Sequence, residues 1–251
     1  MRYFIQFSYD GTGYSGYQIQ PRQLTVQEVL EKSLSTLLRQ PVKTIGAGRT
    51  DAGVHASDMY AHFNFPDPFP PNFLKRLNSF LPDDIAVRRI VPVADQAHAR
   101  FDALRRTYRY FISTRKNPFK QKFHAQFLYY DLEVQKMNEA ARILFEYTDF
   151  TSFSKLHADN KTNDCTIFEA RWEQNEDELV FIITANRFLR NMVRAITGTL
   201  IDVGRGKRTL GDFREIIEKK DRAFASTSAP AQGLVLVKVE YPEEVFLTSG
   251  D

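Results

Sequence analysis

The sequence contains only one cysteine, Cys165, among its 251 residues. A single thiol excludes an intramolecular disulfide framework and any metal site built from several cysteines, and we interpret Cys165 as a small buried residue. No apolar run approaches the length that crosses a bilayer, and the first residues do not have the pattern of a signal peptide. These absences predict a soluble, cytoplasmic protein.

The GxxxxGK[ST] loop that binds nucleotide phosphates is absent as well. The spacing GxGxxG occurs once, as GTGYSG at residues 11–16. The motif alone is a weak signal, so no nucleotide cofactor is expected. Asp51, His55 and His62 have spacings that a metal site could use, but no HExxH or His/Cys pattern accompanies them. Histidines in such a setting more often pack or form hydrogen bonds. We therefore expect neither a metal nor a cofactor.

Charge of one sign is not in large excess, since 34 basic residues face 31 acidic ones. The distribution is uneven, however. Between residues 100 and 122 eight basic residues stand against Asp102 alone, whereas acidic residues gather at 173–178. The eight are Arg100, Arg105, Arg106, Arg109, Arg115, Lys116, Lys120 and Lys122. This segregation predicts a basic face suited to a nucleic acid.

Hydrophobic residues make up 43% of the chain, enough for one large or two modest domains. In the first half, alternating apolar residues predict strands over 3–9, 42–47, 59–65 and 85–93. A capping box at 25–28 followed by an apolar stripe predicts a helix that ends before Pro41, and a second helix is expected over 72–81. The resulting order, β-α-β-β-α-β, is that of a ferredoxin-like unit.

The second half again alternates sheet and helix. Strands are expected over 105–112, 166–172, 179–185 and 234–239, and helices over 133–145, 187–203 and 210–219. We therefore predict an α+β fold of two similar ferredoxin-like or RRM-like halves. A mainly antiparallel central sheet would carry helices packed on it, with a cleft between the halves. The halves would span 1–105 and 106–251.

A glycine-rich stretch from Gly46 to Ala56 separates two of the predicted strands. Three glycines surround Arg49 and Asp51, and glycine permits positive φ and close approach of another group. Such a loop can present an arginine and a carboxylate to a bulky ligand. The plainer interpretation is a turn in which Asp51 bonds its own backbone.

Two further stretches combine with this loop. Arg187, Arg190 and Arg194 are spaced by three and four residues, so the helix predicted over 187–203 would carry them on one face. Arg194 is the candidate to hold Asp51 ionised and oriented, and an oriented carboxylate can act as a nucleophile. Tyr108, on a strand rich in arginine, fits a surface that stacks on unpaired bases. Each of these interpretations has an alternative. The arginines could form a solvated helix face, Arg194 and Asp51 could form a purely structural salt bridge, and Tyr108 could belong to the core.

The segment 10–21 is rich in Gly, Tyr and Gln. It suits a surface that stacks on and hydrogen-bonds a ligand, and it equally suits an ordinary connection from strand to helix.

Together these stretches resemble the tRNA pseudouridine synthase A (TruA-type) family. The matching stretches are YDGT at 9–12, GYQIQ at 16–20, TVQ at 25–27, GRTDAGVHA at 48–56, HARF at 98–101, YRY at 108–110, FLRNMVR at 188–194 and APAQGL at 229–234. They run along nearly the whole chain in the family's order. One departure is Tyr17, where the family usually has tryptophan.

The resemblance implies isomerisation of uridine to pseudouridine at positions 38 to 40 of the tRNA anticodon stem-loop. It assigns Asp51 as the nucleophile, Arg194 as its ion-pair partner, Tyr108 as the ring that stacks on the target base and Arg49 as the residue that assists base flipping. It further implies a homodimer that clasps tRNA without a metal or cofactor. The residues expected to hold RNA are His98, Arg100, Phe101, Lys116, Arg187 and Arg190.

Two other functions fit parts of the same pattern. A non-catalytic RNA-binding protein would use the same basic face, although an anionic side chain among phosphates would not help it. A metal-dependent RNA nuclease or phosphodiesterase would use the histidines and Asp51.

Overall fold

The structure is a computed structural model that describes residues 1–155 and 162–247. By its internal contacts the chain divides into two compact units. The first comprises Met1–Leu104 and Leu236–Asp251, and the second comprises Arg105–Val235. Most of the last strand therefore belongs to the first unit. The sequence-based division had instead placed all of residues 106–251 in the second half.

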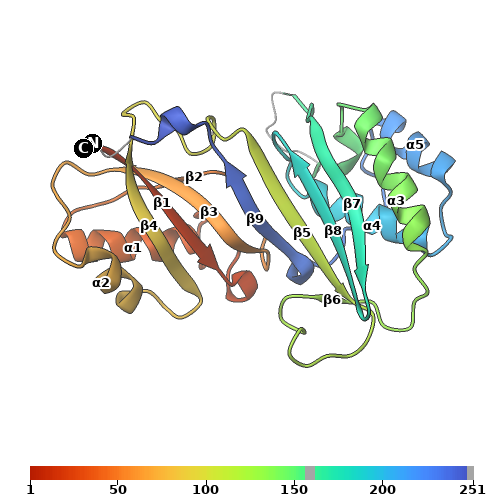
Figure 1. Cartoon of the computed structure of the whole chain (residues 1–251), viewed down its shortest axis with the longest axis horizontal. Helices are drawn as coiled ribbons and strands as arrows, with labels where there is room; N and C mark the ends of the chain where they lie inside the picture. The colour runs from red at the N-terminus through yellow and green to blue at the C-terminus, as the bar shows by residue number, and fades with distance from the viewer. Residues whose placement is uncertain (156–161, 248–251) are drawn as a thin grey trace. The chain divides into compact units, whose positions relative to one another are not determined.

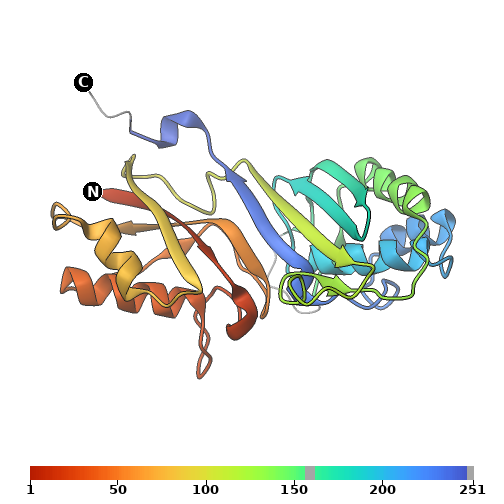
Figure 2. The ribbon, with the colours of Figure 1, turned by 60° about the horizontal axis from the view of Figure 1, so that its bottom comes forward.

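The first unit is a sheet with the strand order β4-β1-β3-β9, in which the short β2 also pairs with β3. Its strands are β1 (Arg2–Tyr9), β2 (Ile45–Gly46), β3 (His55–Asn64), β4 (Ile85–Val93) and β9 (Leu234–Glu240), and its helices are α1 (Val26–Leu38) and α2 (Phe73–Phe80). Short 3-10 turns lie at Gly11–Gly13 and Glu243–Val245. Figures 1 and 2 show both helices on one face of this sheet.

The first strand is buried on both of its faces. β1 lies between β3 and β4, antiparallel to both, and Phe4, Ile5 and Phe7 are buried. The hydroxyl of Thr25 accepts a hydrogen bond from the backbone N–H of Glu28, which caps the start of α1. Burying such apolar side chains supplies about 1.5–3 kcal/mol each.

The second unit contains β5 (Arg105–Ser113), β8 (Glu178–Ala185) and β7 (Ile167–Asn175) in the order β5-β8-β7. β6 (Ala125–Gln126) runs parallel to β5. The helices are α3 (Val134–Ile143), α4 (Met192–Gly204) and α5 (Leu210–Lys219), and 3-10 turns lie at Leu144–Glu146, Thr151–Phe153 and Ala231–Gly233. Among them α3 packs on α4 and β7 (Figure 1).

The coarse prediction of an α+β fold with a mainly antiparallel sheet is confirmed. Within the described ranges, β1 pairs antiparallel with β3 and β4, β2 with β3, and β8 with β5 and β7, whereas β6 runs parallel to β5. Two predicted strand boundaries were wrong, because β2 covers only two residues of 42–47 and β3 begins at His55 rather than at residue 59. The glycine-rich loop is therefore shorter than predicted.

Tyr17, the departure from the family pattern, belongs to the core of the first unit. Its side chain is only 2% exposed and its ring contacts that of Phe7. A Cβ atom on Gly46 would lie 2.3 Å from the Tyr17 ring, so the glycine makes room for it. The hydroxyl is buried and forms no hydrogen bond of normal geometry, although Thr44 lies in its neighbourhood.

Tyr17→Phe should therefore be neutral or raise the free energy of unfolding, because an unsatisfied buried hydroxyl costs about 1–3 kcal/mol. Urea unfolding followed by circular dichroism measures the effect. As the matched control, Tyr17→Ala should lose about 3–5 kcal/mol through the cavity it leaves. A loss above about 1 kcal/mol in Tyr17→Phe would mean that the hydroxyl has a partner.

Candidate active site

The loop that carries Asp51 connects β2 to β3 in the first unit. It begins where the backbone N–H of Ala47 donates to the Tyr60 carbonyl oxygen at 2.7 Å, and it ends in a turn where the Val54 N–H donates to the Asp51 carbonyl oxygen at 3.1 Å. Gly53 takes φ +76° inside this turn, a conformation that favours glycine. Asp51 is half-buried and Arg49 is exposed. The loop thus displays a cation beside a carboxylate that is partly withdrawn from solvent.

A second loop, at residues 10–17, holds the Asp51 loop from one side. A Cβ atom on Gly11 would lie 2.0 Å from the Val54 carbonyl oxygen, and one on Gly16 would lie 2.3 Å from that of Thr50. Gly16 also has φ +94°. Any side chain at these two glycines would push the loops apart, so the contact between the two backbones depends on them.

Hydrogen bonds complete the contact between the two loops. The Tyr9 hydroxyl lies 2.9 Å from Thr50 Oγ1, and the Gly53 N–H donates to the Tyr14 carbonyl oxygen at 3.2 Å. The Gly11 N–H donates to Nδ1 of buried His55, and that nitrogen also lies 3.1 Å from Asp10 Oδ1. Residues on both sides of Asp51 are therefore fixed, and His55 contributes to packing.

This arrangement bears on the stacking role that was considered for segment 10–21. Tyr14 and Tyr17 are buried, and the Tyr14 hydroxyl donates to Asp84 at 2.6 Å. Their rings are therefore unavailable for stacking on a ligand. The segment acts as the support of the Asp51 loop.

In the second unit, Tyr108 lies on β5 opposite Ile183 of β8. Its ring is half-buried and meets the ring of Phe188 edge to face, with centroids 5.2 Å apart and planes at 87°. Such a contact fixes the plane of the tyrosine ring. The neighbouring Tyr110 points into the core, where its hydroxyl donates to the Pro230 carbonyl oxygen at 2.8 Å.

Arg194 lies in the first turn of α4 and is half-buried. Its Nε donates to the Ala229 carbonyl oxygen at 2.8 Å, and the Ala229 N–H donates back to the Arg194 carbonyl oxygen at 2.9 Å. A Cβ atom on Gly198 would lie 2.0 Å from the Thr227 carbonyl oxygen, so this loop lies directly on the helix. The guanidinium is thereby oriented, and its two terminal nitrogens form the edge that binds a carboxylate in bidentate fashion.

The predicted arginine stripe was wrong for two of its three members. α4 begins at Met192, so Arg187 and Arg190 precede the helix. Asn191 takes φ +66°, and the Asn186 side chain accepts hydrogen bonds from the N–H groups of Thr166 and Arg187. These local bonds hold the chain in a turn where the sequence pattern predicted helix.

The turn at residues 98–102 packs on β3 in the first unit. The N–H groups of Arg100 and Phe101 donate to His98 Nδ1, and the His98 ring contacts those of His62 and Phe101. Phe101 is 74% exposed and the Arg100 guanidinium lies over its ring. Burial lowers the pKa of His62 to about 4, so that ring is neutral at neutral pH.

The Asp51 loop begins close to this turn and ends away from it. His62, on which the turn packs, pairs with Ile45 of β2, just before the loop begins. His62 is also seven residues along β3 from His55, where the loop ends, which is about 23 Å at about 3.3 Å per strand residue.

The remaining predicted residues are dispersed in the second unit. Lys116 is exposed on the loop after β5, and Arg190 is exposed before α4. The guanidinium of Arg187 makes two long contacts, of 3.3 and 3.4 Å, to Thr162.

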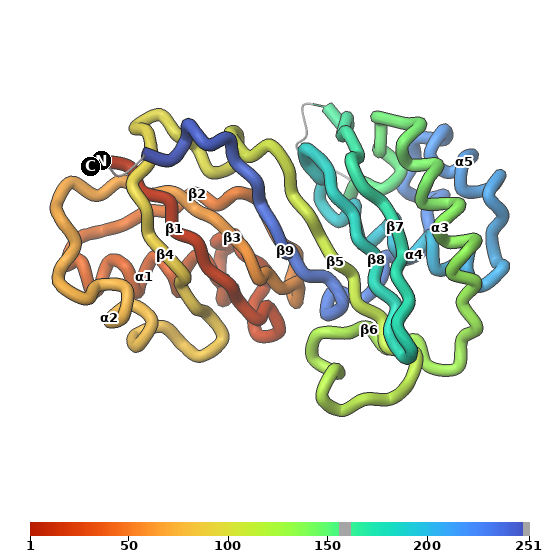
Figure 3. Tube along the Cα trace, viewed as in Figure 1, coloured from red at the N-terminus to blue at the C-terminus, as the bar shows by residue number. Residues whose placement is uncertain are grey.

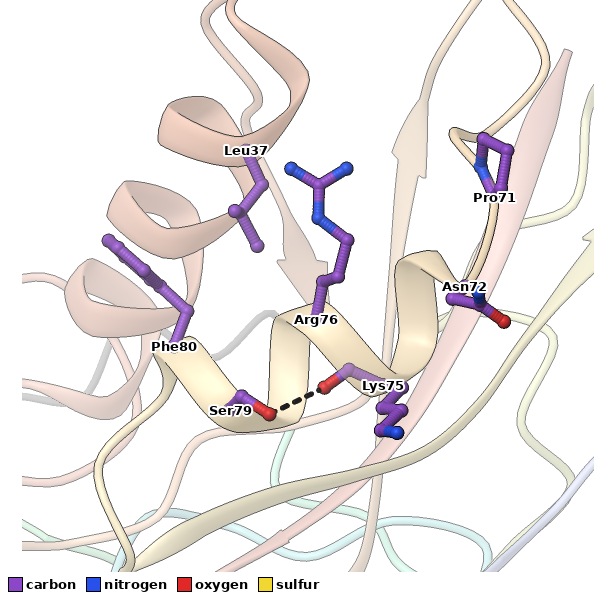
Figure 4. Close-up of a pocket in the computed structure, with 7 residues that line it drawn as sticks. All are labelled: Leu37, Pro71, Asn72, Lys75, Arg76, Ser79 and Phe80. Atoms are coloured by element: carbon purple, nitrogen blue, oxygen red, sulfur yellow. Dashed lines mark hydrogen bonds between the residues drawn. The ribbon is translucent and has the colours of Figure 1, made fainter.

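Other features of the chain offer no competing site. In the part that the structure describes, no cluster of three His, Cys, Asp or Glu residues is arranged to hold a metal, and no helix has the length and apolarity to span a bilayer. A hollow between α1 and α2, lined by Leu37, Arg76 and Phe80 among others, contains none of the predicted site residues (Figure 4).

Several residues that build the site were not singled out from the sequence. Tyr9, Gly11 and Gly16 support the Asp51 loop, and Phe188 and Ala229 orient Tyr108 and Arg194. All five lie within the family-like stretches, which was the available signal. What each one does depends on contacts between segments far apart in the chain.

Comparison with known proteins agrees with this site. The family model described as tRNA pseudouridine synthase matches residues 5–102 and 140–242. The tRNA pseudouridine synthase A of Bacteroides thetaiotaomicron is 57% identical over 98% of this chain and 92% of its own length. Those of Porphyromonas gingivalis and Bacillus licheniformis are 52% and 44% identical, over 98% and 96% of this chain and 99% of their own lengths.

The fold and the supported carboxylate are accordingly those of a pseudouridine synthase. The chain belongs to the tRNA pseudouridine synthase family, and the resemblance read from the sequence motifs is confirmed.

Tyr9→Phe tests the support of the Asp51 loop. Loss of the hydroxyl leaves Thr50 without this hydrogen bond, so we expect kcat to fall about 5- to 10-fold while KM for tRNA stays within about 2-fold. The cost should be about 0.5–1.5 kcal/mol, the net value of one hydrogen bond. Steady-state kinetics of pseudouridine formation measure both. The matched control is Tyr3→Phe, on the same strand, and an equal loss in both variants would contradict the assigned role.

Proposed function

We propose that this protein isomerises uridine to pseudouridine at positions 38 to 40 of the tRNA anticodon stem-loop, with Asp51 as the nucleophile. The observation that carries the proposal is the placement of Asp51 on a loop fixed on both sides by glycine contacts and hydrogen bonds. The reaction replaces a carbon–nitrogen glycosidic bond by a carbon–carbon bond. Because it is an isomerisation, it adds no water and changes no oxidation state.

The charge on Asp51 must persist in a partly closed site. Burial alone would raise the pKa of a carboxyl group, and a nearby guanidinium opposes that effect. We assign this part to Arg194, whose orientation by Ala229 suits a bidentate pair. The pair would keep Asp51 anionic and aimed at the target nucleotide.

The target base must leave the helical stack before it can react, which costs a few kcal/mol. We assign Arg49, exposed on the same loop as Asp51, to assist this flipping. Tyr108 would then stack on the everted base. Its edge-to-face contact with Phe188 supports this role, because it fixes the ring plane before the base arrives.

The tRNA is longer than the site, and the dispersed basic residues fit that requirement. We propose that His98, Arg100 and Phe101 contact RNA, which the exposure of the Phe101 ring beside the His98 ring supports. Lys116, Arg187 and Arg190 would contact phosphates elsewhere. Such contacts supply much of the affinity and make it depend on salt.

We further propose that the two halves are ferredoxin-like, which the order β4-β1-β3-β2 of the first unit supports, and that a cleft between them binds the RNA. The first half would carry the nucleophile, and the second would carry Tyr108 and Arg194. We also propose that the protein acts in the cytoplasm as a homodimer, without a metal or cofactor.

Asp51→Asn tests the nucleophile. The substitution preserves shape and removes the charge, so pseudouridine formation should fall at least 10³-fold while the affinity for tRNA changes less than about 3-fold. Chemical mapping of pseudouridine and a gel-shift assay measure the two. Asp67→Asn, a change at an exposed carboxylate of the same unit, is the control. Residual turnover of the Asp51 variant above a few per cent would reject the proposal.

Tyr108→Phe and Tyr108→Ala separate the ring from its hydroxyl. Stacking on one base contributes about 1–3 kcal/mol, so the alanine variant should lose about 10- to 100-fold in kcat/KM. The phenylalanine variant keeps the ring and should lose less than about 3-fold. Phe188→Leu, which only loosens the ring, should fall between them. Equal loss in both Tyr108 variants would show that the hydroxyl is the group required.

A further inference from the structure

The loop between α5 and β9 lies along α4 in the second unit, and Figure 3 traces it between these two elements. We call residues 221–229 the supporting loop. The Ser226 N–H donates to Thr199 Oγ1 at 3.2 Å, and the carbonyl group of the next residue lies against Gly198. Two residues further on, the backbone exchanges two hydrogen bonds with Arg194. The supporting loop therefore follows α4 from its middle toward its first turn.

The hydroxyl of Ser228 joins the supporting loop to the start of α4. Ser228 Oγ accepts a hydrogen bond from Asn191 Nδ2 at 2.7 Å and a second from Arg222 Nη2 at 3.0 Å. The other terminal nitrogen of Arg222 donates to the Ala225 carbonyl oxygen at 3.1 Å. Arg222 thus ties two points of the loop together, while Asn191 ties the loop to the helix. Because both lone pairs of the hydroxyl oxygen are engaged, its position is well defined.

Asn191 forms this bond in place of the usual helix cap. It is the N-cap residue of α4, and in the described part of the chain its side chain accepts no N–H group of the first turn. An asparagine at this position usually stabilises its helix by accepting such an N–H. Asn191 also takes φ +66°, which is uncommon for a residue with a side chain. Helix stability therefore does not account for Asn191, whereas the bond to Ser228 does.

The fixed hydroxyl lies one residue before the carbonyl group that orients Arg194. Ala229 has no polar side chain of its own, so the direction of its carbonyl depends on its neighbours. On one side Ser228 is held by its two donors. On the other side Pro230 has a fixed φ and confines Ala229 to extended backbone, and its carbonyl oxygen accepts from the Tyr110 hydroxyl at 2.8 Å. The acceptor for Arg194 Nε is thereby held from both sides.

We propose that Ser228 is a positioning residue for the reaction and acts through Arg194. With Asn191 and Arg222 as its two donors, its hydroxyl holds the Ala229 carbonyl where that group orients the guanidinium. This role needs no contact between Ser228 and the substrate. The inference rests on the part that the proposed function gives to Arg194, and it names the group that keeps this arginine in place.

Ser228→Ala in the full chain removes the acceptor from both donors, and nitrogen-15 NMR of the arginine Nε–H groups measures the result. The Arg194 signal, assigned by its absence in Arg194→Lys, reports the bond to Ala229. Its exchange with water should become at least about 5-fold faster, because two hydrogen bonds that hold the loop are lost. Ser228→Thr keeps the hydroxyl and should stay within about 2-fold of the wild type. The matched control is Ser226→Ala, which removes a hydroxyl that accepts from Arg208 in the same loop and should also stay within about 2-fold.

Kinetics test the same residue in the reaction. Ser228→Ala should lower kcat about 10-fold and leave KM for tRNA within about 2-fold, because a positioning residue does not bind the substrate. In an Arg194→Ala background the same substitution should cost less than about 2-fold, since there is no guanidinium left to orient. Asn191→Gly removes one donor while suiting the positive φ, and it should also lower kcat without raising KM.

The outcomes separate the inference from the function on which it rests. An Arg194→Ala variant with full activity would remove Arg194 from the proposed function and this inference with it, and would leave Asp51 as the nucleophile. Wild-type exchange and wild-type kcat in Ser228→Ala, beside a slow Arg194→Ala variant, would overturn the inference alone. An equal loss from Ser228→Ala with and without Arg194 would overturn it as well, because Ser228 would then act on the stability of the loop and not through the arginine.

Discussion

The structure depends on the close approach of two backbones in the first unit. Gly11 and Gly16 lie against the carbonyl groups of Val54 and Thr50, at distances that leave no room for a side chain. This close contact brings the Tyr9 hydroxyl within hydrogen-bond distance of Thr50 and the Gly11 N–H within hydrogen-bond distance of His55. A loop fixed at the residues flanking Asp51 gives its carboxylate few alternative directions. The glycines therefore act on the chemistry without touching a substrate.

The second unit contains a similar backbone contact at a glycine, and there it orients a positively charged group. Gly198 lies against the Thr227 carbonyl, and the loop placed in this way lets Ala229 exchange two hydrogen bonds with Arg194. In both units a glycine lets two segments touch backbone to backbone, and the contact orients one charged group. In the proposed ion pair, a carboxylate and a guanidinium that are oriented in advance would lose little conformational entropy. A small loss of entropy is important here, because moving the target base out of the helical stack also costs free energy.

The parts of the fold that could be predicted were those where local pattern and tertiary packing agree. The strand at 85–93 and the helix at 210–219 were predicted to the residue, and α1 was predicted from its cap and apolar stripe. The start of α4 was missed because Leu189 continues the helical period, yet Asn186 and Asn191 hold the backbone in a turn. The apolar period says nothing about a side chain that bonds a neighbouring strand.

The site followed the same rule. Asp51, Tyr108 and Arg194 were proposed from motifs, because their residue types suit the proposed chemistry. The residues that position them were not, because Tyr9, Phe188 and Ala229 act only through contacts with distant segments. Stretches such as YDGT and APAQGL were visible in the sequence. Their function as supports became clear only from the geometry.

The charged residues differ in how exposed their side chains are. This difference suggests how one reaction geometry can be combined with a large and variable substrate. Asp51 and Arg194 are half-buried on supported backbone, whereas Arg49, Arg100 and Lys116 are exposed. A long exposed side chain keeps many rotamers and can follow phosphates whose positions differ from one RNA to another. The nucleophile proposed at Asp51 cannot have that freedom, since a displacement of 1 Å can cost about 10²-fold in rate. In the proposed mechanism the exposed basic residues would therefore adapt to different RNAs, while the supported loop of the first unit keeps the position of Asp51 fixed.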